Sequence, residues 1–331
     1  MGNVLAAASP PPPLPSGLSP PPPPQSPGDG PPKPPDTAAD DSNPGSMEEL
    51  HKKCKEVFPM PFDGARVVIT KGLSNHFQLS HTISMSNGVT IPAGYRFGAT
   101  YIGTKQTSPT EAYPIVYGEI DPSGNMTSRI LHLVGDRVKL QIGAQIQDAK
   151  CVMAQLTTDY RGRDFTASLT LGNIDLINSS GVAVLHYLQN VSRRVALGGE
   201  LAYQYGPQVP GNEIAVLSLA GRYSSPNSFT LSGTLSSSGA HLCYYQKGGE
   251  NIQVGVEVET NLRMAESTAT FGYQVDLPKA NLLFRGMVDS NWTVGGVLEK
   301  KLLPLPFTFA LSGQINHIKH ATRIGAGLYL G

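Results

Sequence analysis

A two-residue alternation of apolar and polar side chains runs through most of the chain, from residue 66 to residue 331. The repeated unit is about ten residues of alternation followed by a turn. In the segment 165–171, Leu169 and Leu171 fall on one face, whereas Ser168 and Thr170 fall on the other. A period of two is that of a β-strand. A long series of strands with one apolar face and one wet face is typical of a membrane β-barrel.

The low fraction of charged residues indicates that part of the protein surface faces lipid. Only 15% of the 331 residues are charged, compared with about 25% in soluble domains, and 40% are hydrophobic. The formal net charge is zero, which argues against binding to nucleic acid. No apolar run reaches the roughly 18 residues that a membrane helix needs. We therefore expect strands, rather than helices, to span the bilayer.

The N-terminal region divides into an extension and a helix. Residues 1–45 are rich in Pro, Gly and Ser and are expected to be disordered, because they cannot bury a core. We interpret this extension as a solvated spacer, although a Pro-rich tract is also a typical ligand of SH3-type domains. Residues 46–60 are expected to hold an amphipathic helix, since Ser46 and Glu49 form a capping box. Its apolar stripe, expected to pack in the lumen, contains Leu50, Cys54, Val57 and Phe58.

Residues 61–331 are expected to form a single all-β transmembrane barrel. The alternating segments number about nineteen, and a length of about 12–16 residues per strand and turn allows roughly 17–22. An odd number forces the first and last strands to pair in parallel. If both termini lie on one side, the segment before the first strand must cross the lumen, and the helix is placed to do that. About nineteen strands enclose a pore roughly 35–40 Å wide between backbones. Side chains and the helix narrow this bore, so it admits an unfolded chain or a helix but not a folded domain.

Alternation also predicts which charged side chains line the lumen. Four bases are expected there, namely Arg96, Lys139, Arg222 and Arg285. A larger set of acids is expected there, namely Glu200, Glu257, Glu259, Asp276, Asp289 and Glu299. Weak contacts of about 0–1 kcal/mol each suit a conduit, because tight binding would block passage. The plainer interpretation of any single acid is an ordinary polar residue that solvates the wall.

No motif points to catalysis or to a cofactor. The chain lacks a phosphate loop, a nucleophile elbow and a zinc signature, and its three cysteines are widely spaced. His76 and His81 lie on opposite faces of a strand, as do His317 and His320, so neither pair can chelate a metal. We therefore expect no enzymatic activity, no cofactor and no metal site.

Five segments carry a resemblance to a known family. They are KGLSNHFQ at 71–78, YIGTKQ at 101–106, YRGRDF at 160–165, LPKANLLF at 277–284 and DSNW at 289–292. Together they make the chain similar to the channel subunit of the translocase of the outer mitochondrial membrane, the general protein-import pore. The resemblance spans residues 46–331.

The C-terminus contributes a separate motif. Four residues resemble the terminal-strand signal that the mitochondrial barrel-assembly machinery reads, namely Arg323, Gly325, Leu328 and Leu330. Leu328 and Leu330 share one face, and a glycine lets a neighbouring backbone approach closely. We expect these residues to direct assembly of the barrel.

The resemblance implies a channel that imports unfolded precursor proteins across the mitochondrial outer membrane, with both termini in the intermembrane space. It implies that the lumen acids guide the basic presequences of those precursors. The implied partners are precursor proteins, the receptor and small single-helix subunits of the translocase, intermembrane-space chaperones, the lipid bilayer and further copies of the barrel.

Two alternatives remain open at the level of the sequence. A metabolite and anion channel of the mitochondrial porin type has the same fold, but it predicts a basic lumen and no Pro-rich extension. A soluble β-rich interaction protein with a Pro-rich tail belongs to a different class, and carbonate would release it from membranes.

Overall fold

The computed structural model describes residues 43–86, 93–108, 111–175, 180–207, 209, 211–225 and 229–331. The extension expected at 1–45 therefore lies outside the described residues, except for 43–45. Within the described ranges, no helix is long and apolar enough to cross a membrane.

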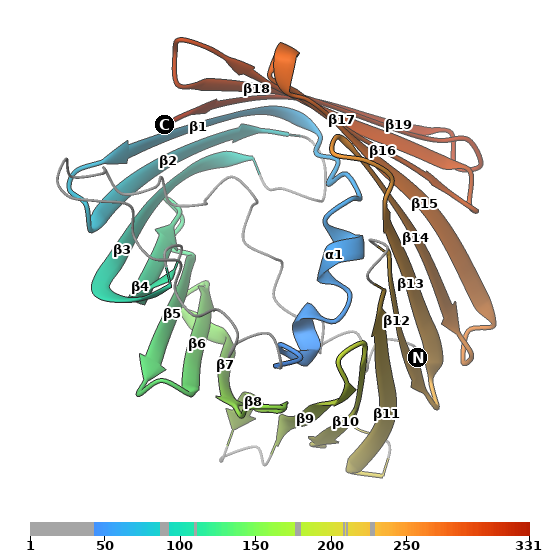
Figure 1. The fold of residues 1–331 in the computed structure, drawn as a ribbon. Helices are drawn as coiled ribbons and strands as arrows, with labels where there is room; N and C mark the ends of the chain where they lie inside the picture. The colour runs from blue at the N-terminus through green and yellow to red at the C-terminus, as the bar shows by residue number, and fades with distance from the viewer. Residues whose placement is uncertain are drawn as a thin grey trace, which may run out of the picture.

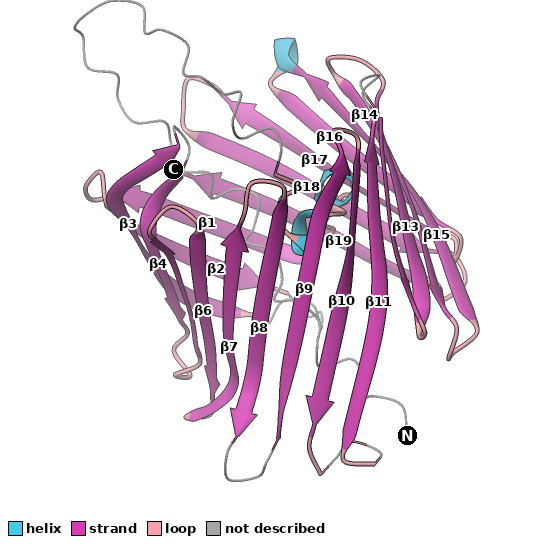
Figure 2. Ribbon diagram, turned by 60° about the horizontal axis from the view of Figure 1, so that its bottom comes forward, coloured by secondary structure: helices cyan, strands magenta, loops and turns pink. Residues whose placement is uncertain are grey.

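Nineteen strands form one closed sheet (Figure 1), which confirms the expected fold. Sequence neighbours pair in antiparallel fashion all the way round, and the strands run between two rims (Figure 2). The strands are β1 (Gly64–Gly72), β2 (Phe77–Met85), β3 (Gly94–Ser108), β4 (Glu111–Ile120), β5 (Met126–Val134), β6 (Val138–Gln147), β7 (Lys150–Arg161), β8 (Phe165–Asp175), β9 (Ser180–Ser192), β10 (Val195–Tyr205), β11 (Glu213–Ser224), β12 (Phe229–Ser236), β13 (Gly239–Lys247), β14 (Ile252–Asn261), β15 (Glu266–Leu277), β16 (Leu282–Asp289), β17 (Thr293–Leu302), β18 (Phe307–Asn316) and β19 (Ala321–Leu330).

The barrel closes through a parallel pairing of β1 with β19. The register runs from Gly64 opposite Gly325 to Ile69 opposite Leu330. The parallel pairing follows from the odd number of strands, because in an antiparallel series the first and nineteenth strands run in the same direction.

The two faces of the sheet differ as the alternation predicts. Large apolar side chains are exposed on the outer face, among them Leu169, Leu185 and Leu217. The inner face carries small polar side chains such as Thr166 and Ser232, which are buried. An exposed apolar exterior around a polar interior is the arrangement of a barrel that faces lipid on the outside.

A segment of residues 43–62, which we call the lumen segment, lies inside the ring of strands beside β13 and β14 (Figure 1). It follows the inner wall round the barrel. Asn43 bonds to Thr166 of β8 at 3.1 Å, and Met47 and Leu50 pack in a cluster with residues of β9, β10 and β11. Further on, the Phe62 N–H donates to the Ser312 hydroxyl of β18 at 2.9 Å.

The continuous helix expected at 46–60 is wrong in its extent. The segment contains a 3-10 turn, η3 (Met47–Glu49), and one short helix, α1 (Lys52–Lys55). Glu49 still accepts a hydrogen bond from the Ser46 N–H at 3.3 Å, as a capping box requires. A straight helix cannot follow a curved wall. Leu50 packs with residues of β9, β10 and β11, whereas Cys54 and Val57 lie against Gly255 of β14, and the segment breaks between these two contacts.

Both ends of the described chain lie at the same rim of the barrel. Asn43 donates to the backbone oxygens of Gly162 and Phe165, in the turn after β7. Gly331 follows β19, which runs parallel to β7 because both are odd-numbered in an antiparallel series. Since β1 begins at the opposite rim, the lumen segment crosses the pore from one end to the other.

Candidate functional site

The inner face of the barrel is identified by its contacts with the lumen segment. A Cβ added to Gly255 of β14 would lie 3.2 Å from the Cys54 sulfur, and one added to Gly272 of β15 would lie 2.6 Å from the Phe58 ring. From these two positions, alternation identifies the other inward residues of each strand, and the register between strands identifies those of the neighbouring strands.

Five of the six predicted acids lie on four neighbouring strands, β14 to β17, and all face inward. A sixth inward acid there, Glu266, was missed in the sequence. We call this set the acidic wall: Glu257, Glu259, Glu266, Asp276, Asp289 and Glu299. The same face of these strands carries the bases Arg285 and Lys301. The remaining predicted acid, Glu200, faces inward on β10, away from this wall.

Some of the acids are already paired. Glu257 lies 2.5 Å from His241, Glu299 lies 3.2 Å from Arg285, and Glu200 lies 3.2 Å from His186. In the described residues four acids of the wall form no salt bridge, namely Glu259, Glu266, Asp276 and Asp289. Asp289 accepts a hydrogen bond from the Asn291 N–H, but none of the four carboxylates is neutralised by a base. Glu257 lies two residues from Gly255, which contacts Cys54 and Val57, so it is closer to the lumen segment than Glu259 is.

The opposite side of the lumen carries the bases. We call this set the basic wall: Arg66, Arg96, Arg129, Lys139 and Arg161, on β1 to β7. Among the described side chains of these strands, the inward acids are Glu119, 3.7 Å from Arg96, and Asp159, opposite Lys139. The fourth predicted base, Arg222, lies apart on β11 and donates to the Pro44 carbonyl at 2.7 Å. The lumen is therefore negative on one side and positive on the other.

The predicted apolar stripe is packed against the wall. Leu50, Cys54 and Val57 are 3%, 2% and 0% exposed, and Phe58 is half-buried after α1 has ended. Lys53 of α1 is exposed instead. The stripe therefore fixes one side of the segment while its charged side faces the bore.

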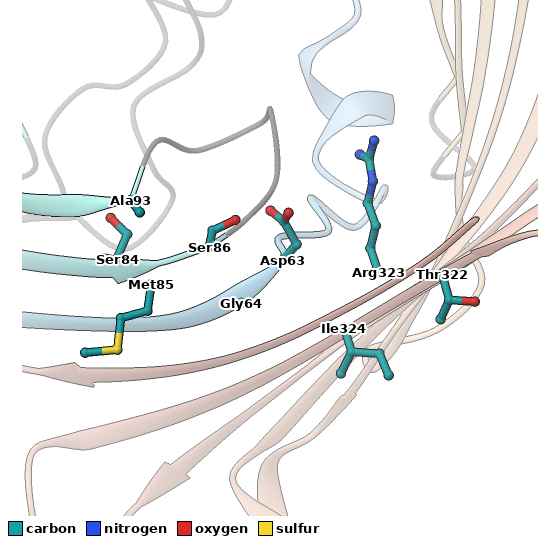
Figure 3. Close-up of a pocket in the computed structure, with 9 residues that line it drawn as sticks. All are labelled: Asp63, Gly64, Ser84, Met85, Ser86, Ala93, Thr322, Arg323 and Ile324. Carbon is teal, nitrogen blue, oxygen red and sulfur yellow. The ribbon is translucent and has the colours of Figure 1, made fainter.

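The predicted assembly residues lie at the seam where the barrel closes. A Cβ on Gly325 would lie 2.3 Å from the Phe62 carbonyl oxygen, so no side chain fits there. Leu328 and Leu330 alternate with Gly325 and therefore face outward. Figure 3 shows Arg323 extending toward the lumen segment and Ile324 extending to the other side.

Sequence reasoning missed several residues of the site. His186 and His241 pair with Glu200 and Glu257, and Glu119 pairs with Arg96. Alternation alone places each of them inward. The pairing needs the strand register, which a single sequence does not supply.

Comparison with known proteins finds a family model and several similar chains. The family model described as "Eukaryotic porin" matches residues 43–325. The chain is 54% identical to the mitochondrial import receptor subunit TOM40 homolog 2 of Drosophila melanogaster, over 88% of this chain and 84% of that one. It is 49% identical to the TOM40 homolog of Xenopus tropicalis over 100% of both chains. It is also 49% identical to that of Homo sapiens, over 87% of this chain and 78% of the human one. Among solved structures, a mutant of the Rh. blastica porin matches with a TM-score of 0.43 and 14% identity, over 70% of this chain and 94% of that chain.

Proposed function

The chain belongs to the eukaryotic porin family and is a homologue of the mitochondrial import receptor subunit TOM40, and on that premise we propose that it conducts unfolded precursor proteins through the mitochondrial outer membrane. It is an outer-membrane β-barrel of the translocase. The observation that supports the role most strongly is the charge-divided lumen, whose acidic wall runs from one rim of the barrel to the other.

The acidic wall suits the chemistry of a basic presequence. Asp289 lies near the rim at which β1 begins, Glu259 lies further in, and Asp276 lies near the opposite rim, since Asp276 N–H bonds to Asn251 in the turn before β14. A basic side chain can therefore pass from one unpaired carboxylate to the next. Each contact is weak and screened within about 8 Å at physiological salt, so the chain is guided without being held.

The orientation and partners extend this proposal. Asn43 and Gly331 share a rim, and we assign that rim to the intermembrane space, where chaperones receive the emerging precursor. The apolar outer face then contacts lipid, the receptor and small single-helix subunits, and other copies of the barrel.

Ion selectivity separates this role from that of a metabolite and anion channel. Because the acids of β14 to β17 outnumber the bases there, and four of these acids form no salt bridge in the described residues, we expect cations to permeate more readily than anions. Reversal potentials across a salt gradient in planar bilayers measure this preference. Anion preference would favour the metabolite channel and contradict the proposal.

The lumen segment is proposed to narrow the bore. Deleting residues 46–58 removes the buried stripe together with α1, so we expect a larger single-channel conductance and altered current noise. Lys53→Gln serves as the control, because Lys53 is exposed and its replacement leaves the stripe in place. Unchanged currents after the deletion would show that the segment does not obstruct the pore.

A further inference from the structure

Nitrogen and sulfur ligands gather where the lumen segment meets β13. His51 precedes α1, and His241 and Cys243 lie two residues apart on the inner face of β13. One possible ligand atom from each of these residues lies within 4.8 Å of the other two. The rings of His51 and His241 are 4.3 Å apart between centroids. The spacing of these residues along the sequence does not predict the cluster, because its members come from separate elements.

His51 is oriented as a metal-binding histidine is. Its Nδ1 lies 2.8 Å from the hydroxyl of Ser232, which is buried on β12. When Nδ1–H donates to that hydroxyl, the lone pair resides on Nε2. In the described residues Nε2 is buried without a hydrogen-bond partner. An unsatisfied buried polar atom is costly, and a cation bound at Nε2 would remove that cost.

Further ligands surround the cluster. His241 Nε2 lies 3.4 Å from the Cys243 sulfur and 2.5 Å from a Glu257 carboxylate oxygen. Cys54 of α1 is buried next to Cys243, and its sulfur lies 3.4 Å from the Tyr244 carbonyl. Glu257 and Cys54 are therefore the neighbouring side chains from which a fourth ligand would come.

We propose that His51, His241 and Cys243 form a binding site for a zinc-class divalent cation, which ties the lumen segment to the barrel wall. Zn²⁺ prefers nitrogen and sulfur ligands in a tetrahedral arrangement, with bonds of about 2.0–2.1 Å to nitrogen and about 2.3 Å to sulfur. Cys243 binds as a thiolate and releases its proton to solvent. Since the ligands come from two elements, the bound cation holds the segment in one position. The inference does not depend on what the pore conducts.

Cobalt provides a spectroscopic test on the full-length chain in lipid nanodiscs under reducing conditions. We expect Co²⁺ to give a thiolate charge-transfer band with tetrahedral d–d bands, saturating at about one equivalent and displaced by Zn²⁺. Cys243→Ser and His51→Gln should abolish the band, and Ser232→Ala should weaken binding about 10–100-fold, because it removes the support of His51. Cys151→Ser is the matched control and should leave the band unchanged, since Cys151 is exposed on β7.

Circular dichroism and single-channel conductance confirm that each variant still forms a barrel. His51→Gln keeps the test independent of barrel folding, because His51 lies outside the strands. Absence of a thiolate band in the wild-type protein would overturn the proposal, and so would a band that survives Cys243→Ser. A reducible bond between Cys54 and Cys243, with no cobalt signal after reduction, would equally contradict it.

Discussion

Gly325→Trp is expected to abolish integration of the barrel while leaving synthesis intact. A Cβ at this position already lies 2.3 Å from the Phe62 carbonyl oxygen, so an indole must displace the lumen segment or open the seam between β1 and β19. Overpacking typically costs about 1–3 kcal/mol, and here the added side chain clashes with backbone at the parallel pairing that closes the barrel. Carbonate extraction of membranes from expressing cells measures integration.

Gly143→Trp is the matched control for this prediction. Gly143 lies in the middle of β6 on the same inner face, opposite Arg129, and nothing lies within 4 Å of an added Cβ. The control should integrate normally. Normal integration of Gly325→Trp would contradict the account of the seam, and failure of both variants would show a general intolerance of tryptophan. Leu328→Asp, which places a charge on the outer face of β19, should fail in the same way as Gly325→Trp.

Neutralising three of the unpaired acids is expected to slow import of precursors that carry basic presequences. The variant combines Glu259→Gln, Asp276→Asn and Asp289→Asn, which keep shape and remove charge. Each exposed contact contributes about 0–1 kcal/mol, so we expect import to slow about five- to tenfold and cation preference to fall. Precursors without a presequence should be imported at the original rate. Import into mitochondria that contain only the variant measures both classes.

The control removes the same charge elsewhere in the lumen. It combines Glu119→Gln, Asp159→Asn and Glu200→Gln, which lie outside the acidic wall. The control should affect presequence import much less than the wall variant does. Equal slowing by both variants would make net charge, rather than the position of the acids, the determinant. Equal slowing of both precursor classes would indicate a structural defect.

The strand architecture is predictable from the sequence because alternation is a local property. The residue types along a single strand show which positions face inward and which face outward, as Ser168 and Leu169 illustrate on β8, and turns separate the strands. The number of strands and the parallel closure follow from counting these alternating segments. For the same reason, the inward positions of Glu259 and Asp276 were accessible from the sequence.

The contacts between strands and the path of the lumen segment were not accessible in this way. The pairing of Glu257 with His241 depends on the register between β13 and β14. The break between η3 and α1 depends on the curvature of the wall that Leu50 and Cys54 contact. The cluster of His51, His241 and Cys243 requires both the register and the path, so it appears only when the chain is folded.

Photocrosslinking of an arrested precursor tests the role of the lumen most directly. A photoreactive residue at Thr270 of β15 lies on the inner face, opposite both Glu257 and Asp289, whereas one at the neighbouring Ala269 lies on the outer face. A presequence precursor is halted in transit by a tightly folded C-terminal domain that the bore excludes. We expect a crosslink to the precursor from position 270 and none from position 269. No precursor crosslink from position 270, or equal crosslinks from both positions, would contradict passage of the precursor through this barrel.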